Sequence, residues 1–159
     1  MSDYIVVFNK GKIDQYGTPH EIYYEPRTQY VADFIGTTNF IEATVLEHNE
    51  KEALVTYGQE APIKVQAKVH VNKAEEILLS VRPESLRINQ PDVEGFSINA
   101  TVKYSMFLGE KERYFLEDNT GKEWIVDAYD VGHVRYTGEV TISAVADKLH
   151  LIKKTTGII

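Results

Sequence analysis

From Phe40 onward, short apolar runs alternate with turn residues, and this pattern constrains the fold more than any other feature. The runs predict strands over 40–48, 52–57, 61–67, 76–82, 85–89, 96–107, 111–118, 122–128, 137–143 and 147–153. Turn residues separate them, at Asn49-Glu50, Tyr57-Gly58, 89–92, Gly109-Glu110, 118–121 and Gly132. Many short strands at such spacing predict a mainly β fold with one closed or nearly closed barrel, or two.

Two short segments of this β-rich region are similar in sequence. Residues 41–45 read IEATV and residues 98–102 read INATV, and each opens a group of predicted strands. The similarity predicts a duplicated barrel unit of about 50–60 residues. The alternative is that β-rich sequences look alike over so short a length.

The N-terminal segment has a different character. Residues 4–8 (YIVVF) are β-rich, and residues 12–15 resume the strand pattern after the turn signal Asn9-Lys10-Gly11. These residues predict a β-hairpin in which Gly11 adopts the backbone angles that other residues resist.

A short helix is predicted directly after the hairpin. Thr18 is a good N-cap residue, Pro19 stands at the first helical position, and Glu21 follows the cap by three residues. This is a capping box, in which the two side chains bind backbone N–H groups that lack helical partners. The helix is expected to run to about Tyr24 and to stop before Pro26.

A second helix is predicted from an apolar stripe formed by Tyr30, Val31, Phe34 and Ile35. Gly36 is expected to end it as the residue after the C-cap. A polar connector follows, and we place the domain boundary there. Residues 1–38 then form a tail with a hairpin and two helices, and residues 39–159 form the barrel region.

The composition excludes several classes of function. The chain has 159 residues, a net charge of −7 and no cysteine, so disulfides and thiolate metal sites are excluded. Nucleic-acid binding is disfavoured, since phosphate contacts require clustered Lys and Arg. No apolar run approaches the roughly 20 residues needed to span a bilayer, and no secretory signal is visible.

No catalytic or metal-binding motif is visible either. The five histidines contain no pair at the spacing of zinc ligands: His20, His48, His70, His133 and His150. The carboxylate pairs Glu75-Glu76 and Glu117-Asp118 are explained by solvated faces and hairpin tips. We therefore expect no catalytic residue, no cofactor-binding residue and no metal ligand.

Three segments resemble the C-terminal region of the ATP-binding subunits of ABC importers. Residues 4–39 are similar to the segment that leaves the nucleotide-binding domain in that family. Arg82-Pro83-Glu84 is similar to a motif of its TOBE-type, OB-like barrel, and Gly109 with Tyr114 is similar to a later hairpin. The matching motif residues are Gly17, Thr18, Pro19, Glu21, Gly36, Arg82, Pro83, Glu84, Gly109 and Tyr114.

The resemblance implies a non-catalytic module for regulation and dimerisation. ATP hydrolysis in the family needs the loop Gly-x-x-x-x-Gly-Lys-Ser/Thr, which this sequence lacks. ATP and magnesium would thus belong to an absent N-terminal domain, and this chain would not be an enzyme. The implied partners are a second copy of the chain and the permease subunits. The implied location is the cytoplasm, at the inner face of the cell membrane.

Other interpretations remain open at this point. The barrel is alternatively a sensor of a small solute or an oxyanion, or, less favoured, an OB-type nucleic-acid binder. Arg82 and Glu84 are expected to act as a structural charged pair, with oxyanion binding by Arg82 as the alternative. Tyr23, Tyr24 and Tyr30 are expected to pack the helices rather than to form a partner surface.

Overall fold

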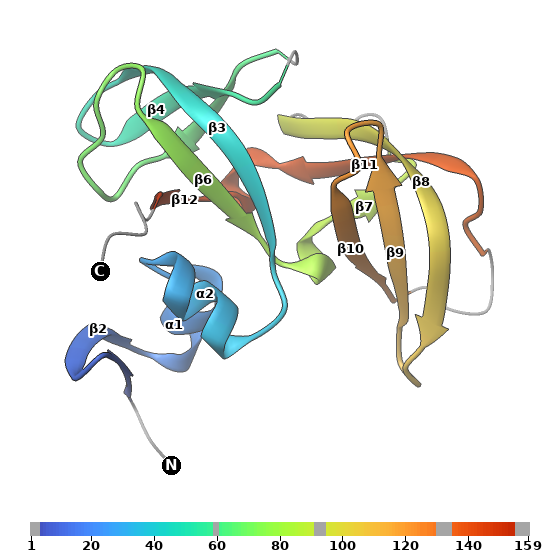
Figure 1. Ribbon diagram of the computed structural model, residues 1–159, viewed down its shortest axis with the longest axis horizontal. Coiled ribbons are helices and arrows are strands. Elements are labelled where there is room, and N and C mark those ends of the chain that lie inside the picture. The colour runs from blue at the N-terminus through green and yellow to red at the C-terminus, as the bar shows by residue number, and fades with distance from the viewer. Residues whose placement is uncertain (1–3, 59–60, 91–94, 130–134, 155–159) are drawn as a thin grey trace. The chain divides into compact units, whose positions relative to one another are not determined.

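The computed structural model describes residues 4–58, 61–90, 95–129 and 135–154, and the predicted turn at Gly132 lies outside them. The fold is mainly β, as predicted, with two five-stranded sheets, a separate hairpin and two short helices (Figure 1). The chain divides into two compact units. Unit 1 contains residues 1–80 and 149–159, and unit 2 contains residues 81–148.

The N-terminal segment of unit 1 has the predicted order of elements. Strands β1 (Ile5–Asn9) and β2 (Lys12–Gly17) form an antiparallel hairpin. Lys10 and Gly11 both have positive φ, at 53° and 78°, as a two-residue type I′ turn requires. Helices α1 (Pro19–Tyr24) and α2 (Gln29–Ile35) follow. Figure 1 shows both helices between this hairpin and the sheet of unit 1.

The sheet of unit 1 has the strand order β12-β6-β3-β4-β5. Its strands are β3 (Asn39–His48), β4 (Glu52–Thr56), β5 (Ile63–Gln66), β6 (Glu76–Val81) and β12 (His150–Lys153). Alternate residues of β3 are buried, which gives a strand with one face in the core. Ala32 of α2 packs against Leu78, Ile152 and Phe40, so the helices are fixed to this sheet.

The sheet of unit 2 has the strand order β10-β9-β8-β11-β7. Its strands are β7 (Arg87–Ile88), β8 (Gly95–Phe107), β9 (Glu112–Asp118), β10 (Glu123–Ala128) and β11 (Glu139–Val145). The core contains Phe96 and Trp124, whose ring centres lie 5.4 Å apart. Two 3-10 helices, η1 (Pro83–Ser85) and η2 (Ala146–Lys148), complete the described elements.

The two sheets have the same internal arrangement. In each, the first long strand (β3 or β8) is central, its hairpin partner lies on one side, and a later strand (β6 or β11) lies on the other. The repeated IEATV and INATV segments lie on those two central strands. The sequence similarity therefore corresponds to equivalent positions in two repeated sheets.

The fifth strand of each sheet is exchanged between the repeats. After β6 the chain passes through η1 into β7, which pairs with β11 in unit 2. After β11 it passes through η2 into β12, which pairs with β6 in unit 1. Strand β7 thus follows the strands of the first sheet in the sequence but pairs in the second sheet, and β12 follows the strands of the second sheet but pairs in the first. Strand patterns alone do not predict this exchange.

The predicted strands over 85–89 and 147–153 are wrong at their starts. Both regions begin with a 3-10 helix followed by a shorter strand. Pro83 explains the first case, because its fixed φ suits the first position of a helical turn. Gly36 is also corrected. It ends α2 with φ of 173°, which is extended backbone, rather than in the left-handed conformation expected of a glycine after a C-cap.

None of the helices among the described residues is long and apolar enough to cross a bilayer.

Candidate functional site

The hairpin β1–β2 has one buried face and one exposed apolar face. Val7 packs inward against Ile22 of α1 and Val31 of α2. On the opposite face, cross-strand partners Val6 and Tyr16 are both exposed, as are the neighbouring residues Phe8 and Ile13. We call these four residues, together with Tyr4, the apolar face: Tyr4, Val6, Phe8, Ile13 and Tyr16.

The apolar face is unusual for a two-stranded hairpin in water. Tyr16 is 67% exposed and Phe8 is 60% exposed, although both are large. Contiguous exposed apolar side chains of this kind mark surfaces that pack on another protein part. Of the charged residues of the hairpin, Lys10 and Lys12 flank Gly11 at the turn, and Asp14 accepts a hydrogen bond from the Thr28 hydroxyl at 2.6 Å.

The predicted capping box lies at the start of α1. The Thr18 hydroxyl accepts a hydrogen bond from the Glu21 backbone N–H at 3.2 Å, and the Glu21 carboxylate accepts one from the Thr18 backbone N–H at 3.2 Å. The hydrogen bond from the Thr18 backbone holds the pKa of Glu21 below its ordinary value, and the Thr18 hydroxyl adds to this. Gly17 is buried next to this cap. Thr18, Pro19 and Glu21 therefore fix the start of α1.

Replacing the cap residue gives a direct test of this role. Thr18→Ala is expected to lower the free energy of unfolding by about 1 kcal/mol, because the N–H group at the helix start loses its acceptor. Thr18→Ser is the matched control, since it keeps the hydroxyl and should stay near wild type. Urea unfolding followed by far-ultraviolet circular dichroism measures both, and an unchanged Thr18→Ala midpoint would contradict the capping role.

Apart from Gly36 at the end of α2, the other motif residues lie in unit 2, at separate places along the chain. Arg82 is only 3% exposed and directly precedes η1, where Pro83 is buried and Glu84 half-buried. Gly109 occupies the β8–β9 connection with φ of 92°. Tyr114 is buried on β9, and its hydroxyl accepts a hydrogen bond from the backbone N–H of Tyr136 at 3.2 Å. These positions support turns and packing.

The tyrosines near the helices are divided between packing and the surface. Tyr30 is partly buried against the Val7 cluster and stacks on Phe34 with ring centres 5.6 Å apart. Tyr23 and Tyr24 contact each other edge to face at 4.7 Å. Packing of the helices therefore accounts for Tyr30, as expected from the sequence.

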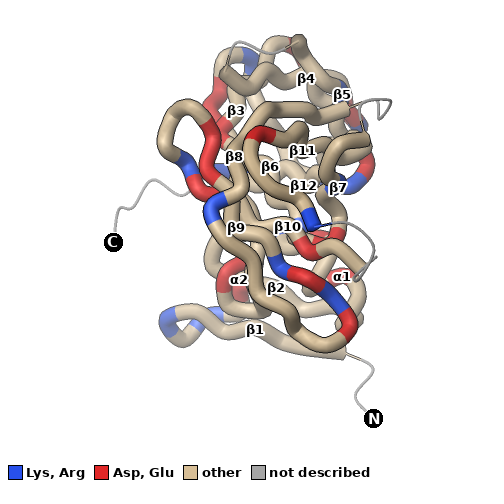
Figure 2. Tube along the Cα trace, turned by 90° about the vertical axis from the view of Figure 1, so that its right-hand side faces the viewer, with Lys and Arg blue, Asp and Glu red and all other residues tan. Residues whose placement is uncertain are grey.

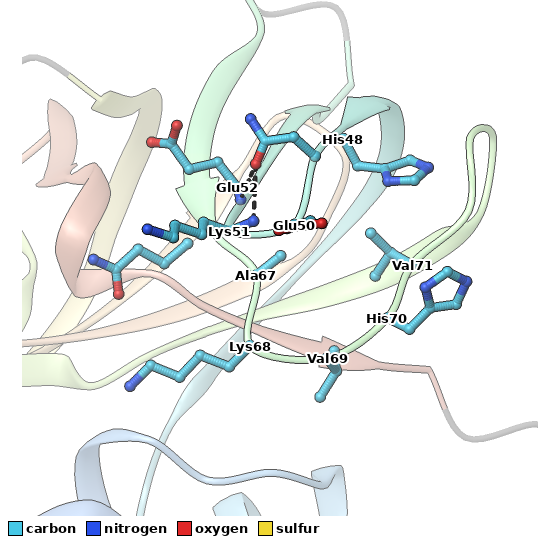
Figure 3. Close-up of a pocket in the computed structure, with 11 residues that line it drawn as sticks. His48, Glu50, Lys51, Glu52, Ala67, Lys68, Val69, His70 and Val71 are labelled. Carbon is cyan, nitrogen blue, oxygen red and sulfur yellow. Dashed lines mark hydrogen bonds between the residues drawn. The ribbon is translucent and has the colours of Figure 1, made fainter.

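A hollow of about 850 Å³ opens at one end of the unit 1 sheet (Figure 3). It lies between the β3–β4 turn and the loop after β5. Its lining residues are His48, Asn49, Glu50, Lys51, Glu52, Gln66, Ala67, Lys68, Val69, His70 and Val71. The Asn49 side chain fixes the turn by accepting hydrogen bonds from the backbone N–H groups of Lys51 and Glu52 at 2.8 and 2.9 Å.

The structure brings His48 and His70 together, which the sequence did not indicate. Their ring centres lie 6.3 Å apart although the residues come from different segments of the chain. In Figure 3 both rings project to the same end of the hollow, on either side of Val71. Among the described residues, no group of three or more His, Cys, Asp or Glu side chains is placed to hold a metal ion.

Unit 2 contains a buried charge cluster on the β9–β10 hairpin. The Asp127 side chain is 0% exposed and accepts hydrogen bonds from Arg113 at 2.8 and 2.9 Å and from Lys111 at 2.9 Å. Burial raises the pKa of Asp127, but the hydrogen bonds and charges of Arg113 and Lys111 outweigh it and hold this pKa below its ordinary value. The carboxylate of Asp127 is thus paired with Lys111 and Arg113, and these contacts tie β10 to the start of β9.

Acidic and basic residues are interspersed along the described trace. Figure 2 shows no continuous basic stripe on it. The whole chain carries a net charge of −7.

Comparison with known proteins gives a family match and two related subunits. Residues 79–152 match the TOBE domain family. The spermidine/putrescine import ATP-binding protein PotA of Acidothermus cellulolyticus is 34% identical over 134 residues, covering 83% of this chain and 35% of that relative. The protein of the same name from Thermobifida fusca is 34% identical over 116 residues, covering 72% of this chain and 30% of that relative. The chain thus spans about a third of the length of these relatives.

A solved structure gives an independent view of the fold. The cytoplasmic molybdate-binding protein ModG is similar with a TM-score of 0.58, covering 73% of this chain and 96% of that chain at 12% sequence identity. At this identity the likeness concerns the fold alone, and it confirms the predicted OB-like β architecture.

Proposed function

This chain carries a TOBE domain over residues 79–152 and is related to the ATP-binding subunits of ABC importers, and from this premise we propose that it is the non-catalytic regulatory region of such a subunit. Regulation of this kind works by favouring one arrangement of two ATP-hydrolysing subunits over another, without chemistry in the barrel itself. The proposal includes a dimer of the chain, permease subunits as further partners, and a location at the cytoplasmic face of the cell membrane.

The apolar face of the β1–β2 hairpin is the observation that carries the proposal. Its inner side is already satisfied by Ile22 and Val31, so Val6, Phe8 and Tyr16 have no role within the described hairpin and helices. We propose that these side chains pack on the ATP-hydrolysing part of the subunit. Since α2 packs on the unit 1 sheet through Ala32, a displacement of the hairpin would be passed to the barrel region.

The sequence of this chain contains no loop of the kind that binds the phosphates of ATP. The only Gly-Lys pairs are Gly11-Lys12 and Gly121-Lys122, and both lie in hairpin turns without a following Ser or Thr. Phosphate binding needs a glycine-rich loop at a helix start, which neither turn provides. ATP and magnesium are therefore proposed to bind outside this chain.

A chimeric subunit tests the proposal. The matching segment of the Acidothermus cellulolyticus subunit is replaced by this chain, and ATP hydrolysis is measured with the permease present. The chimera is expected to remain active, and Val6→Ser with Phe8→Ser is expected to lower the activity by about tenfold or more, as losing two interface anchors does. Lys10→Ser with Lys12→Ser is the control on the same hairpin. Equal activities of the two double variants would refute a docking role for the apolar face.

Solute sensing is the second candidate, favoured by the hollow at the end of the unit 1 sheet. The two related subunits are named for spermidine and putrescine import, and the similar fold is named for molybdate binding. Calorimetric titration of this chain with spermidine, putrescine, molybdate and sulfate tests the candidate. Heat from one of them, lost in Lys68→Ala, would support sensing at the hollow, and the absence of heat from all four would exclude it for these solutes.

A further inference from the structure

The pair His48 and His70 has features that its role in the fold does not require. Both side chains are exposed, and neither makes a hydrogen bond or ion pair with any other described residue. The two rings contact each other edge to face. In contrast, the backbone beneath each ring is held firmly, since His48 is paired with Ala53 in the sheet and His70 precedes Val71, which is 2% exposed.

The separation of the two rings is close to what a shared metal ion requires. A divalent transition metal bonds to an imidazole nitrogen at about 2.0–2.1 Å, so two rings that bind one ion in tetrahedral coordination have centres roughly 5 Å apart. The observed 6.3 Å is about 1 Å wider than this, so the two rings would have to turn toward each other to share an ion. Both side chains are exposed, so rotation about their side-chain bonds can turn one nitrogen of each ring toward a common point.

The remaining lining of the hollow is balanced in charge. Glu50 and Glu52 are offset by Lys51 and Lys68, so the hollow carries no formal net charge. The imidazoles are the groups in it that prefer transition metals, with Cu²⁺ above Zn²⁺ and Ni²⁺ in affinity.

We propose that His48 and His70 form a binding site for a divalent transition metal, with Zn²⁺, Ni²⁺ and Cu²⁺ as the ions it would take. The chain supplies two imidazoles, and water completes the coordination, because no group of three or more His, Cys, Asp or Glu side chains among the described residues is placed to hold an ion. The site does not depend on the proposed regulatory function.

Metal binding would have a structural consequence in unit 1. It would add a link between the end of β3 and the loop after β5, beside the backbone hydrogen bonds that Ala67 donates to Lys51 and Ala74 donates to Val45. The same loop carries Lys68, which forms an ion pair with Glu25 at the end of α1. An ion at the two histidines would therefore stiffen the loop that contacts the helices of the N-terminal segment.

Calorimetry on the full chain, free of any affinity tag, tests the site with Zn²⁺ and Ni²⁺ as probes. One ion per chain is expected, with affinity reduced about tenfold or more in His48→Ala and in His70→Ala. His20→Ala is the matched control, since His20 is exposed on α1 and away from the hollow, and its affinity should equal that of wild type.

Thermal unfolding gives a second readout that does not rely on heats of binding. An ion that binds only the folded chain raises the unfolding midpoint, and this rise should disappear in both hollow variants but persist in His20→Ala. Both histidines are exposed, so their variants should fold normally without metal. Binding unchanged by either substitution, lost equally in the control, or with one ion per two chains would overturn the proposal.

Discussion

A chain truncated after Lys148 is expected to lose the folded structure of unit 1 while unit 2 still unfolds cooperatively. The truncation removes β12, which is the edge strand of the unit 1 sheet and the partner of β6. Leu149, Leu151 and Ile152 leave with it, and all three are at most 8% exposed. Ile152 also belongs to the cluster that fixes α2 to the sheet.

The size of the effect follows from the apolar area that the strand buries. A buried Leu or Ile contributes about 1.5–3 kcal/mol, so losing three of them costs roughly 5–9 kcal/mol. Whole domains are stable by only about 5–15 kcal/mol. Removal of β12 is therefore expected to lower the free energy of unfolding of unit 1 to near zero or below.

The fluorescence of the single tryptophan allows the unfolding of unit 2 to be followed separately from that of unit 1. Trp124 lies in unit 2, so its fluorescence reports that unit, whereas far-ultraviolet circular dichroism reports both. We expect the truncated chain to show reduced β signal but a retained fluorescence transition. A chain ending at Lys154 is the control, since it keeps β12 and should match the full chain. A full β signal after truncation at Lys148 would contradict the exchanged-strand topology.

The exchanged strands explain why the sequence predicted the elements better than their connections. The hairpin at Gly11, the Thr18 cap and the strand-rich region were predicted correctly, because turn chemistry and alternation are local properties. Strand β7 has only two residues, and its partner β11 follows some 50 residues later. The residues of a strand such as β7 do not show whether it pairs with a strand of its own repeat or with a strand of the other repeat.

The same reasoning applies to the candidate sites. The sequence indicates part of the apolar face, because all of residues 4–8 are apolar and both faces of the strand they form must therefore be apolar. It does not indicate the His48–His70 pair, because the two residues stand on different segments and share no ligand spacing. The end of α2 shows a third case. Gly36 suggested a left-handed cap, but the chain continues directly into β3 in an extended conformation, which requires no glycine.

Asp127→Ala is expected to lower the free energy of unfolding of unit 2 by about 3–5 kcal/mol at neutral pH. The Asp127 carboxylate is fully buried and accepts hydrogen bonds from Arg113 and Lys111. Its removal leaves two cations, each less than a quarter exposed, without their shared partner. Breaking a buried ion pair from one side costs about this much, because the remaining charge stays desolvated.

The pH dependence of this variant follows from the direction of the pKa shift. The folded pKa of Asp127 lies below its ordinary value of 3.8, so the carboxylate stabilises unit 2 fully above that value. As the pH falls through the folded pKa, the carboxylate gains a proton in the native state and the stabilisation is lost. The difference between wild type and Asp127→Ala should therefore be large at pH 7 and shrink in strong acid.

Urea unfolding followed by Trp124 fluorescence measures this difference directly, because Trp124 lies on β10, the strand that carries Asp127. Glu110→Ala is the matched control. It also removes one carboxylate from unit 2, but Glu110 is exposed in the β8–β9 connection, so its loss should change the stability by no more than about 0.5 kcal/mol. Asp127→Asn separates charge from shape, since the amide keeps the volume and one acceptor oxygen. An intermediate stability for Asp127→Asn is expected, and a stability equal to wild type would mean that the buried charge contributes nothing to unit 2.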